Sequence, residues 1–109
     1  MKENFNKLTP AETERLSVLV EELAEGIHIC GKILRHGYDS HDPTKEHIQS
    51  NRDLLIFELG DIECAKDMLI NAGDLGIQTG YDNVTDKITR AKYRKLHKIK
   101  SYLHHQKIV

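Results

Sequence analysis

The chain has 109 residues, a mass of 12.5 kDa and a formal net charge of −1. This length leaves room for one domain, residues 1–109, with a small core, and it excludes a multidomain machine. Charged residues make up 30% of the chain and the mean hydropathy is −0.54, as in soluble proteins with heavily charged helices. No apolar run approaches the roughly 20 residues of a membrane span, and the charged first ten residues do not resemble a signal peptide, so we expect a cytoplasmic protein.

The charge is distributed unevenly. Residues 1–86 contain all 17 acidic residues and 8 Lys or Arg, which gives −9, whereas residues 87–109 contain the other 8 basic residues and no acid. An acidic body joined to a basic C-terminal segment predicts one site for cations and another for anions. The two cysteines, Cys30 and Cys64, lie in apolar helical patterns without CxxC spacing, so we predict reduced core residues rather than a disulfide or a zinc site.

The first helix is predicted to begin at Pro10 and to end before Gly37. Thr9 and Glu12 have the spacing of a capping box, with proline at the first helical position. Apolar residues then recur three or four positions apart, which places them on one stripe of the helix. These residues are Leu16, Leu19, Leu23, Ile27, Cys30 and Leu34.

Two further helices follow. Residues 37–51 are predicted to be a loop, and Ser50 or Asn51 caps a second helix that runs to about Ala72. This helix is apolar over more than half of its circumference, so we expect it to be the most buried. A third, basic helix is predicted from about residue 83, with an inward face. That face comprises Val84, Ile88, Ala91, Ile99 and Tyr102. The predicted fold class is all-α, a bundle of three to four helices per chain that is completed by oligomerisation.

Two pairs of carboxylates have the spacing of ligands for a metal ion. Glu22 and Glu25 are three residues apart on the first helix, and Glu58 and Asp61 are three residues apart on the second. Like charges with this spacing repel, and a divalent cation relieves the repulsion. Oxygen ligands from two antiparallel helices suit Mg²⁺ or Mn²⁺. Acidic motifs are more often solvated faces of helices, but two such motifs on successive helices are a much rarer coincidence.

The surroundings of the two pairs differ. Glu58 and Asp61 interrupt an apolar row on the helix that we expect to be most buried, where a charge needs a partner or a metal ion. On the first helix, the row of Glu22 and Glu25 lies roughly opposite the leucine stripe. That row either faces water or packs on the second helix while the stripe packs on another subunit.

These motifs resemble a known family. EExxE at residues 21–25, followed by ExxD at residues 58–61, is similar to the signature of the all-α nucleoside triphosphate pyrophosphohydrolases, the MazG-like and dimeric-dUTPase superfamily. The resemblance covers roughly residues 9–98, and the segments GKILRHGYDSHDP and NRDLLIFELGD resemble small stand-alone members encoded by bacteriophages, which act in the host cytoplasm. The interval between the motifs is longer than is usual in the family.

The resemblance implies roles for single residues. Glu22, Glu25, Glu58 and Asp61 would bind Mg²⁺, and the catalytic residues would be Glu22 and Glu21, the latter orienting water. Cationic groups early in the final helix, here Lys87 and Arg90, would contact the phosphates of the nucleotide. The family's usual lysine followed by an asparagine or arginine and an aromatic residue is only approximated here. It also implies sites built in homodimers or homotetramers.

Basic residues of the first helix are second candidates for phosphate contacts. Lys32 lies two turns beyond Glu25 on the same row, and Arg35 and His36 follow at the helix end. The later basic tail, residues 95–107, fits a solvated or subunit-contacting helix better than a catalytic one. The chain has no pair of ExxH motifs for a diiron site, no Ser/His/Asp set and no phosphate-binding P-loop.

The sequence therefore predicts a Mg²⁺-dependent hydrolase that converts a nucleoside triphosphate into the monophosphate and pyrophosphate. The motifs fix neither the base nor the sugar, and an alarmone or a modified nucleotide is a further possible substrate. The alternative is a non-enzymatic module that binds nucleic acid or protein through its basic C-terminal helix. The acidic body counts against nucleic acid as a partner, because it repels a polyanion.

Overall fold

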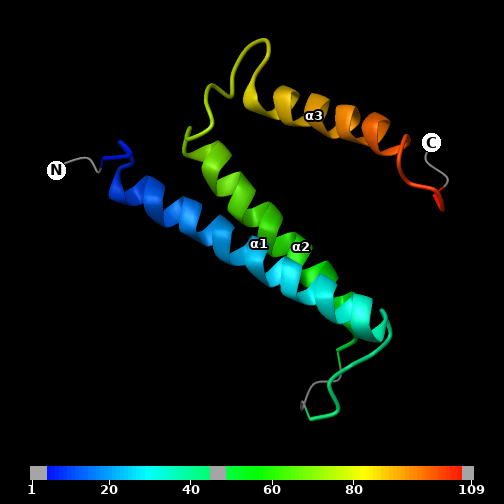
Figure 1. The fold of residues 1–109 in the computed structure, drawn as a ribbon. Helices are drawn as coiled ribbons and strands as arrows, with labels where there is room; N and C mark the ends of the chain where they lie inside the picture. Colours follow the sequence, from blue (N-terminus) through cyan, green and yellow to red (C-terminus); the bar gives the residue numbers. More distant parts are fainter. Residues whose placement is uncertain (1–4, 45–48, 107–109) are drawn as a thin grey trace. The chain divides into compact units, whose positions relative to one another are not determined.

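A computed structural model describes residues 5–44 and 49–106 of the chain. Within these ranges the chain forms three helices and no strand (Figure 1). The helices are α1 (Pro10–His36), α2 (Asn51–Asn71) and α3 (Val84–Ile99). The all-α prediction is thus confirmed. None of the helices in these ranges combines the length and apolarity needed to cross a bilayer.

The helix starts follow the capping residues in the sequence. Thr9 caps α1 in a complete capping box: its hydroxyl accepts from the Glu12 N–H at 3.1 Å, and Glu12 accepts from the Thr9 N–H at 2.9 Å. Ser50 caps α2 by accepting from the Asp53 N–H at 3.2 Å, and Asn83 caps α3 in the same way. The predicted starts of all three helices are confirmed.

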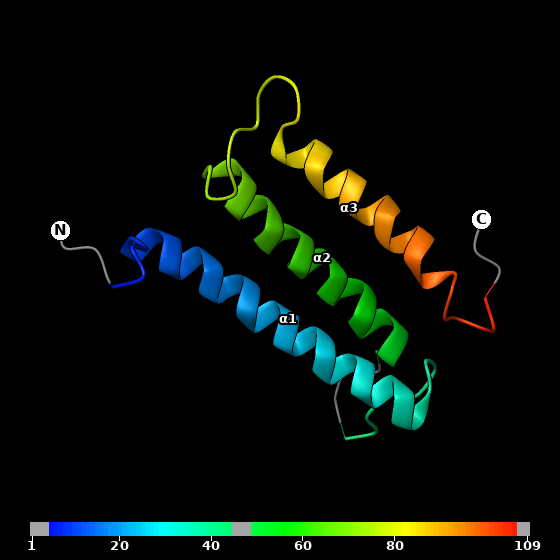
Figure 2. The same cartoon turned by 45° about the horizontal axis from the view of Figure 1, so that its top comes forward.

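The chain divides into two compact units, residues 1–72 and residues 73–109. The first unit is a helical hairpin: α1 and α2 lie side by side and run in opposite directions in both views (Figures 1 and 2). The second unit contains α3 and the turn that precedes it. The single domain expected from the chain length stays a prediction.

The core of the hairpin is small. Ile29 on α1 packs toward α2, where Ala65 is only 1% exposed and Leu69 is also buried. More residues are buried on α2 than on either of the other helices, as the sequence predicts. Even so, Ile56, Phe57 and Leu59 on α2 remain more than half exposed. The hairpin therefore buries only a narrow seam between its two helices.

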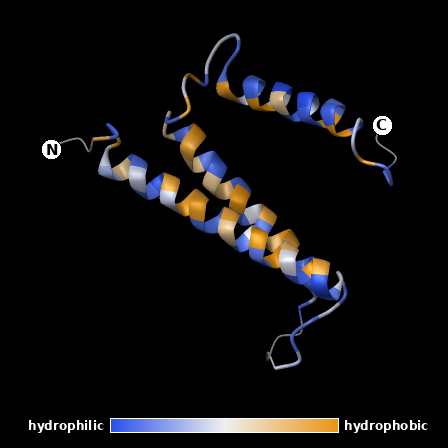
Figure 3. Cartoon of the chain, in the orientation of Figure 1, coloured by the Kyte–Doolittle hydropathy of each residue, from blue (hydrophilic) through white to orange (hydrophobic). Residues whose placement is uncertain are grey.

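The leucine stripe of α1 lies beside this seam and stays largely exposed. Ile27 is 75% exposed and Leu34 is 89% exposed, whereas Gly26 and Ile29 are buried. Glu22 and Ile29, which share a row of α1, therefore face α2 rather than water. The packing of the stripe on another subunit stays a prediction. Hydrophobic positions are frequent along the middle of α1 and α2 in Figure 3, and several of them are exposed.

The position of the stripe corrects the prediction for the cysteines. Cys30 and Cys64 are free thiols, but both are exposed, so the prediction that they are core residues is wrong. Cys30 belongs to the outward stripe of α1, and Cys64 precedes the buried Ala65 on α2. An apolar helical pattern identifies a stripe, but it does not tell which neighbour covers that stripe.

The second unit is held by contacts around its turn. The Val84 N–H donates to the Ile77 carbonyl at 3.1 Å, and the Thr85 N–H donates to Gln78 Oε1 at 3.2 Å. Gly76, with φ of +123°, lies against Val84 and gives the chain a conformation that other residues rarely adopt. These contacts bury Val84, the first residue of α3.

The predicted inward face of α3 is confirmed in part. Val84 is buried, and Ile88, Ala91 and Ile99 are partly buried. Tyr102 lies beyond the end of α3 and is 48% exposed, so its predicted inward position is wrong. The Lys95 ammonium instead lies 5.8 Å from the centre of the Tyr102 ring.

Replacement of Gly26 by leucine is expected to lower the free energy of unfolding by about 1–3 kcal/mol, because a side chain there overpacks the seam. A Cβ atom at Gly26 would lie 3.2 Å from Ile62 Cδ1. The matched control is Gly60→Leu on α2, where a Cβ atom meets nothing within 4 Å, so leucine should be neutral or stabilising. Urea unfolding followed by circular dichroism measures both; equal effects would contradict the close approach of the helices.

Candidate metal centre

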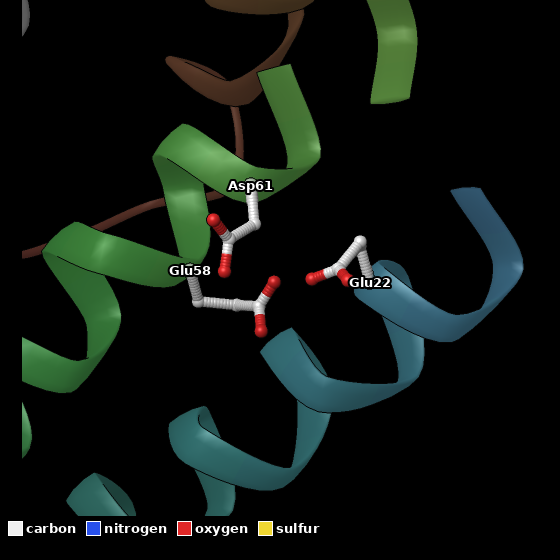
Figure 4. A group of neighbouring side chains, drawn as sticks. All are labelled: Glu22, Glu58 and Asp61. Atoms are coloured by element: carbon white, nitrogen blue, oxygen red, sulfur yellow. The ribbon is translucent and has the colours of Figure 1, made fainter. Parts of the chain in front are cut away.

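Three carboxylates converge at the middle of the hairpin. Glu22 comes from α1, and Glu58 and Asp61 come from α2. One carboxylate oxygen from each residue can be chosen so that all three lie within 4.8 Å of one another. Figure 4 shows the three side chains pointing toward one another across the seam. The i, i+3 spacing on α2 puts its two acids on one side of the helix, and the antiparallel packing brings Glu22 opposite them.

Gly26 sets the closeness of the helices at this point. A Cβ atom at this position would lie 3.8 Å from Glu58 Cγ as well as 3.2 Å from Ile62 Cδ1. The absence of a side chain therefore lets the backbone of α1 cover the stem of Glu58. As a result Glu58 is only 6% exposed, which is rare for a glutamate.

Glu58 is the least satisfied polar group in the described ranges of the chain. Its Oε2 atom is buried and has no hydrogen-bond partner. A proton on Glu58 can be shared with Glu22, and this hydrogen bond, together with burial, raises the pKa of Glu58 from 4.5 to about 7. Repulsion from Glu22, Asp61 and Glu25 contributes to the same rise in the pKa. A buried carboxylate among other carboxylates requires either a proton or a cation.

A hard divalent cation fits this set of donors. Mg²⁺ binds carboxylate oxygens and keeps several positions for water or for the oxygens of a phosphate. Glu22, Glu58 and Asp61 supply three carboxylates, and the unpartnered Oε2 atom of Glu58 gives one of them an oxygen with no competing bond. The set contains no thiolate or imidazole, which Zn²⁺ commonly prefers.

The other two predicted acids lie close by on α1. Glu25 is exposed and lies one turn beyond Glu22; its oxygens are outside the three-carboxylate group, but its charge acts on Glu58. Glu21 is exposed on the neighbouring side of α1. The structure thus brings together three of the four predicted ligands. The roles of Glu25 as a ligand and of Glu21 as a catalytic residue stay predictions.

The predicted phosphate contacts on α3 belong to the second unit. Lys87 is exposed and takes part in none of the ion pairs among the described residues. Arg90 instead pairs with Asp82, whose backbone is left-handed with φ of +58°. Their contact with phosphates stays a prediction.

Lys32 and Arg35, the second candidates, line a pocket at the C-terminal end of α1. The pocket, which we call the basic pocket, has a volume of about 390 Å³. Its other lining residues are His36, Ser40, His41, Asp42, Pro43 and Asn51.

Sequence reasoning missed the loop residues of this pocket. His36 is among the predicted second candidates for phosphate contacts, but the sequence assigns no role to His41 or to the other loop residues of the pocket. The predicted hairpin itself was a usable signal. A loop between two antiparallel helices begins and ends at the same end of the hairpin. This return brings His41 back toward Lys32 and Arg35.

Comparisons with known proteins add no assignment: the chain matches no protein-family model, no curated protein and no solved structure. We therefore infer the candidate metal centre from its geometry alone.

In metal-free solution, the free energy of unfolding is expected to fall as the pH rises from about 4.5 through 7. The folded chain holds a proton on Glu58 in this window that the unfolded chain has released, so a rising pH favours the unfolded chain. Glu58→Gln should lack this part of the pH dependence and have a higher Tm above pH 7.

Thermal unfolding in EDTA over this pH range measures the effect. Glu63→Gln is the control, because Glu63 lies on the same helix but is 69% exposed and pairs with Lys66. Identical pH profiles for the wild type and Glu58→Gln would contradict the burial of a protonated Glu58.

Proposed function

We propose that this protein is a Mg²⁺-dependent pyrophosphohydrolase that converts a nucleoside triphosphate into the monophosphate and pyrophosphate, as a member of the MazG-like and dimeric-dUTPase superfamily. The observation that carries the proposal is the buried Glu58 carboxylate, which has an unpartnered oxygen and faces Glu22 and Asp61. The EExxE and ExxD motifs supply these three residues, in agreement with the resemblance of the sequence to that family.

The three carboxylates would hold the cation and orient it toward the phosphate chain. A bound Mg²⁺ supplies two effects: it lowers the pKa of a coordinated water, and it neutralises charge that develops on the phosphate oxygens. Glu58 would bind the cation as a carboxylate and would give up its proton to water, because a proton and a cation compete for the same oxygens. Glu25, one turn along α1, would be the fourth ligand, as the resemblance implies.

Glu21 would orient the attacking water, and the cationic residues Lys87 and Arg90 would contact the phosphates of the substrate. Glu21 is exposed beside Glu22, from where it orients the attacking water. Lys87 carries an exposed ammonium group on the first turns of α3 that suits a phosphate oxygen, and Arg90 becomes available for the same task when it leaves Asp82. Water attacks directly, and no covalent intermediate on the protein is required.

Glu58→Gln and Asp61→Asn are each expected to lower Mg²⁺-dependent pyrophosphate release by about 100-fold or more, since each removes a charge from the cation site. The assay measures monophosphate and pyrophosphate from a panel of ribonucleoside and deoxynucleoside triphosphates with Mg²⁺ or Mn²⁺.

Two controls accompany this assay. Glu63→Gln removes an acid from the same helix outside the carboxylate group and should retain activity. Lys98→Glu reverses a charge near the end of α3 and should also retain it. If every nucleotide stays intact, the proposed activity is contradicted. If nucleic-acid binding is detected and only Lys98→Glu abolishes it, the non-enzymatic module is supported instead.

The second part of the proposal is that the protein works as a homodimer or homotetramer. An apolar groove of about 460 Å³ is lined by residues of both α1 and α2. Its lining residues are Leu23, Gly26, Ile27, Cys30, Gly31, Leu34, Leu55, Leu59 and Ile62. Exposed apolar patches of this kind are uncommon on monomers and mark interaction sites. One hairpin encloses little space for a nucleotide. A second copy that covers the groove would also enlarge that space.

Ile27→Glu is expected to dissociate the oligomer, because it places a charge in the apolar groove. Size-exclusion chromatography with light scattering measures the mass of the wild type and the variant. Ile77→Glu is the control, since Ile77 is equally exposed, at 75%, but belongs to the second unit. A wild type that is monomeric throughout the micromolar range would contradict oligomerisation.

A further inference from the structure

The basic pocket lies apart from the carboxylates along α1. Lys32 is seven residues beyond Glu25 and ten beyond Glu22, which corresponds to roughly 10 and 15 Å along the helix axis. A phosphate held at the pocket is therefore too far from Glu22, Glu58 and Asp61 to share their cation. The pocket and the carboxylate group are two separate places on one hairpin.

The wall of the pocket is fixed by hydrogen bonds between the loop and the start of α2. Asn51 is buried; its backbone N–H donates to the Ser40 carbonyl at 2.8 Å, and its Nδ2 donates to the Gly37 carbonyl at 3.1 Å. The Arg52 N–H donates to the Tyr38 carbonyl at 2.9 Å. This part of the loop is thus held in place without a ligand.

Side-chain contacts strengthen the same junction. The Arg52 guanidinium pairs with Asp39 and lies 5.2 Å from the centre of the Tyr38 ring. Arg52 is therefore used to hold the loop. Lys32 and Arg35, the cations that face the pocket, form no ion pair or ring contact with a described residue.

Lys32 and Arg35 are unpaired although the first unit is acidic. Neither residue takes part in any of the ion pairs found among residues 5–44 and 49–106, whereas Arg52 and Lys66 both have carboxylate partners. Lys32 is also half-buried, so its ammonium has less access to water than an exposed lysine. Two such cations beside one cavity produce a positive potential there.

The carboxylate in the pocket lining has other partners. Oδ1 of Asp42 accepts from the Thr44 N–H at 2.9 Å and from the Thr44 hydroxyl at 2.6 Å. Asp42 is thus engaged within its own turn. His36 and His41 each add an imidazole N–H donor to the lining, and Ser40 adds a hydroxyl. Ammonium, guanidinium, imidazole and hydroxyl donors around one cavity suit a tetrahedral oxyanion.

We propose that the basic pocket binds a phosphate group, separately from the carboxylate site. Its volume is at the lower end of the range for small-ligand sites, so it accommodates a phosphate together with part of a nucleoside. The phosphate comes either from the far end of the molecule held at the carboxylates or from a second phosphorylated ligand. The phosphate site itself does not depend on the hydrolase activity.

The test is titration of the full chain with inorganic phosphate in EDTA, followed by backbone amide shifts in two-dimensional NMR and by calorimetry. The shifts are expected in residues 32–42. Lys32→Ala and Arg35→Ala are each expected to weaken binding about tenfold, because each removes a charge-assisted hydrogen bond. Lys66→Ala is the matched control: it removes one positive charge from the same unit, but from a residue that pairs with Glu63 and Asp67.

Two results would overturn the proposal. One is a set of shifts that lie outside the pocket, or none at all. The other is equal weakening by Lys66→Ala and by the pocket variants, which would show only a general effect of net charge. Circular dichroism of each variant confirms that it is folded, and the exposure of Arg35 makes its replacement tolerable.

A second titration identifies the source of the phosphate. Guanosine 3′,5′-bis(diphosphate), which carries a diphosphate chain on each side of its ribose, is added with Mg²⁺ to the wild type, to Glu58→Gln and to the Lys32 and Arg35 variants. If Glu58→Gln and the pocket variants all weaken the same binding event, one molecule spans both sites, and the substrate carries phosphates at two ends. If only the Lys32 and Arg35 variants weaken it, the pocket holds a separate ligand. Loss of nucleotide hydrolysis without loss of phosphate binding would contradict the proposed function and leave the pocket intact.

Discussion

The burial of one carboxylate beside two others is the constraint on which the hairpin depends. Removal of a carboxylate from water costs free energy unless a proton or a cation compensates for it. Glu58 is in this position because α1 and α2 approach closely at Gly26, and because Glu22 and Asp61 point at the same space. The raised pKa of Glu58 and its unpartnered oxygen are two expressions of this cost. The stability of the fold is therefore linked to the protonation of Glu58 and, under the proposed function, to the binding of a cation.

The arrangement of polar and apolar groups supports this view. In most helical hairpins the inner seam is apolar and the outer surface is polar. Here the seam contains acids at its centre, and the leucine stripe of α1 lies on the outer surface. The core residues Ile29, Ala65 and Leu69 form a narrow contact that leaves much apolar surface in the solvent. Such a hairpin gains stability from whatever covers its outer groove.

Much of the fold could be predicted from local sequence signals. Thr9, Ser50 and Asn83 are side chains that cap helices through their own backbone neighbours, so the helix starts follow from a few adjacent residues. Glu58 and Asp61 are three residues apart, and this spacing likewise predicts that they lie on the same side of α2. The convergence with Glu22 was predicted from the motifs, and the structure supplies its cause in the absence of a side chain at Gly26.

The rest required three-dimensional information. The side of α1 that faces α2 is a choice between two stripes that both contain apolar residues, so the exposure of Cys30 was predicted wrongly. The basic pocket depends on Asn51, whose hydrogen bonds to Gly37 and Ser40 join positions more than ten residues apart. Contacts of this range leave no periodic pattern in a sequence.

The location of Cys30 has a practical consequence. Its thiol lies within the apolar groove, whereas the thiol of Cys64 lies outside the lining of that groove, and both are accessible in a single chain. The two thiols therefore lie on different parts of the hairpin, and an alkylating reagent can compare their accessibility. The ratio of their alkylation rates reads out whether the groove is covered, with Cys64 as the internal reference.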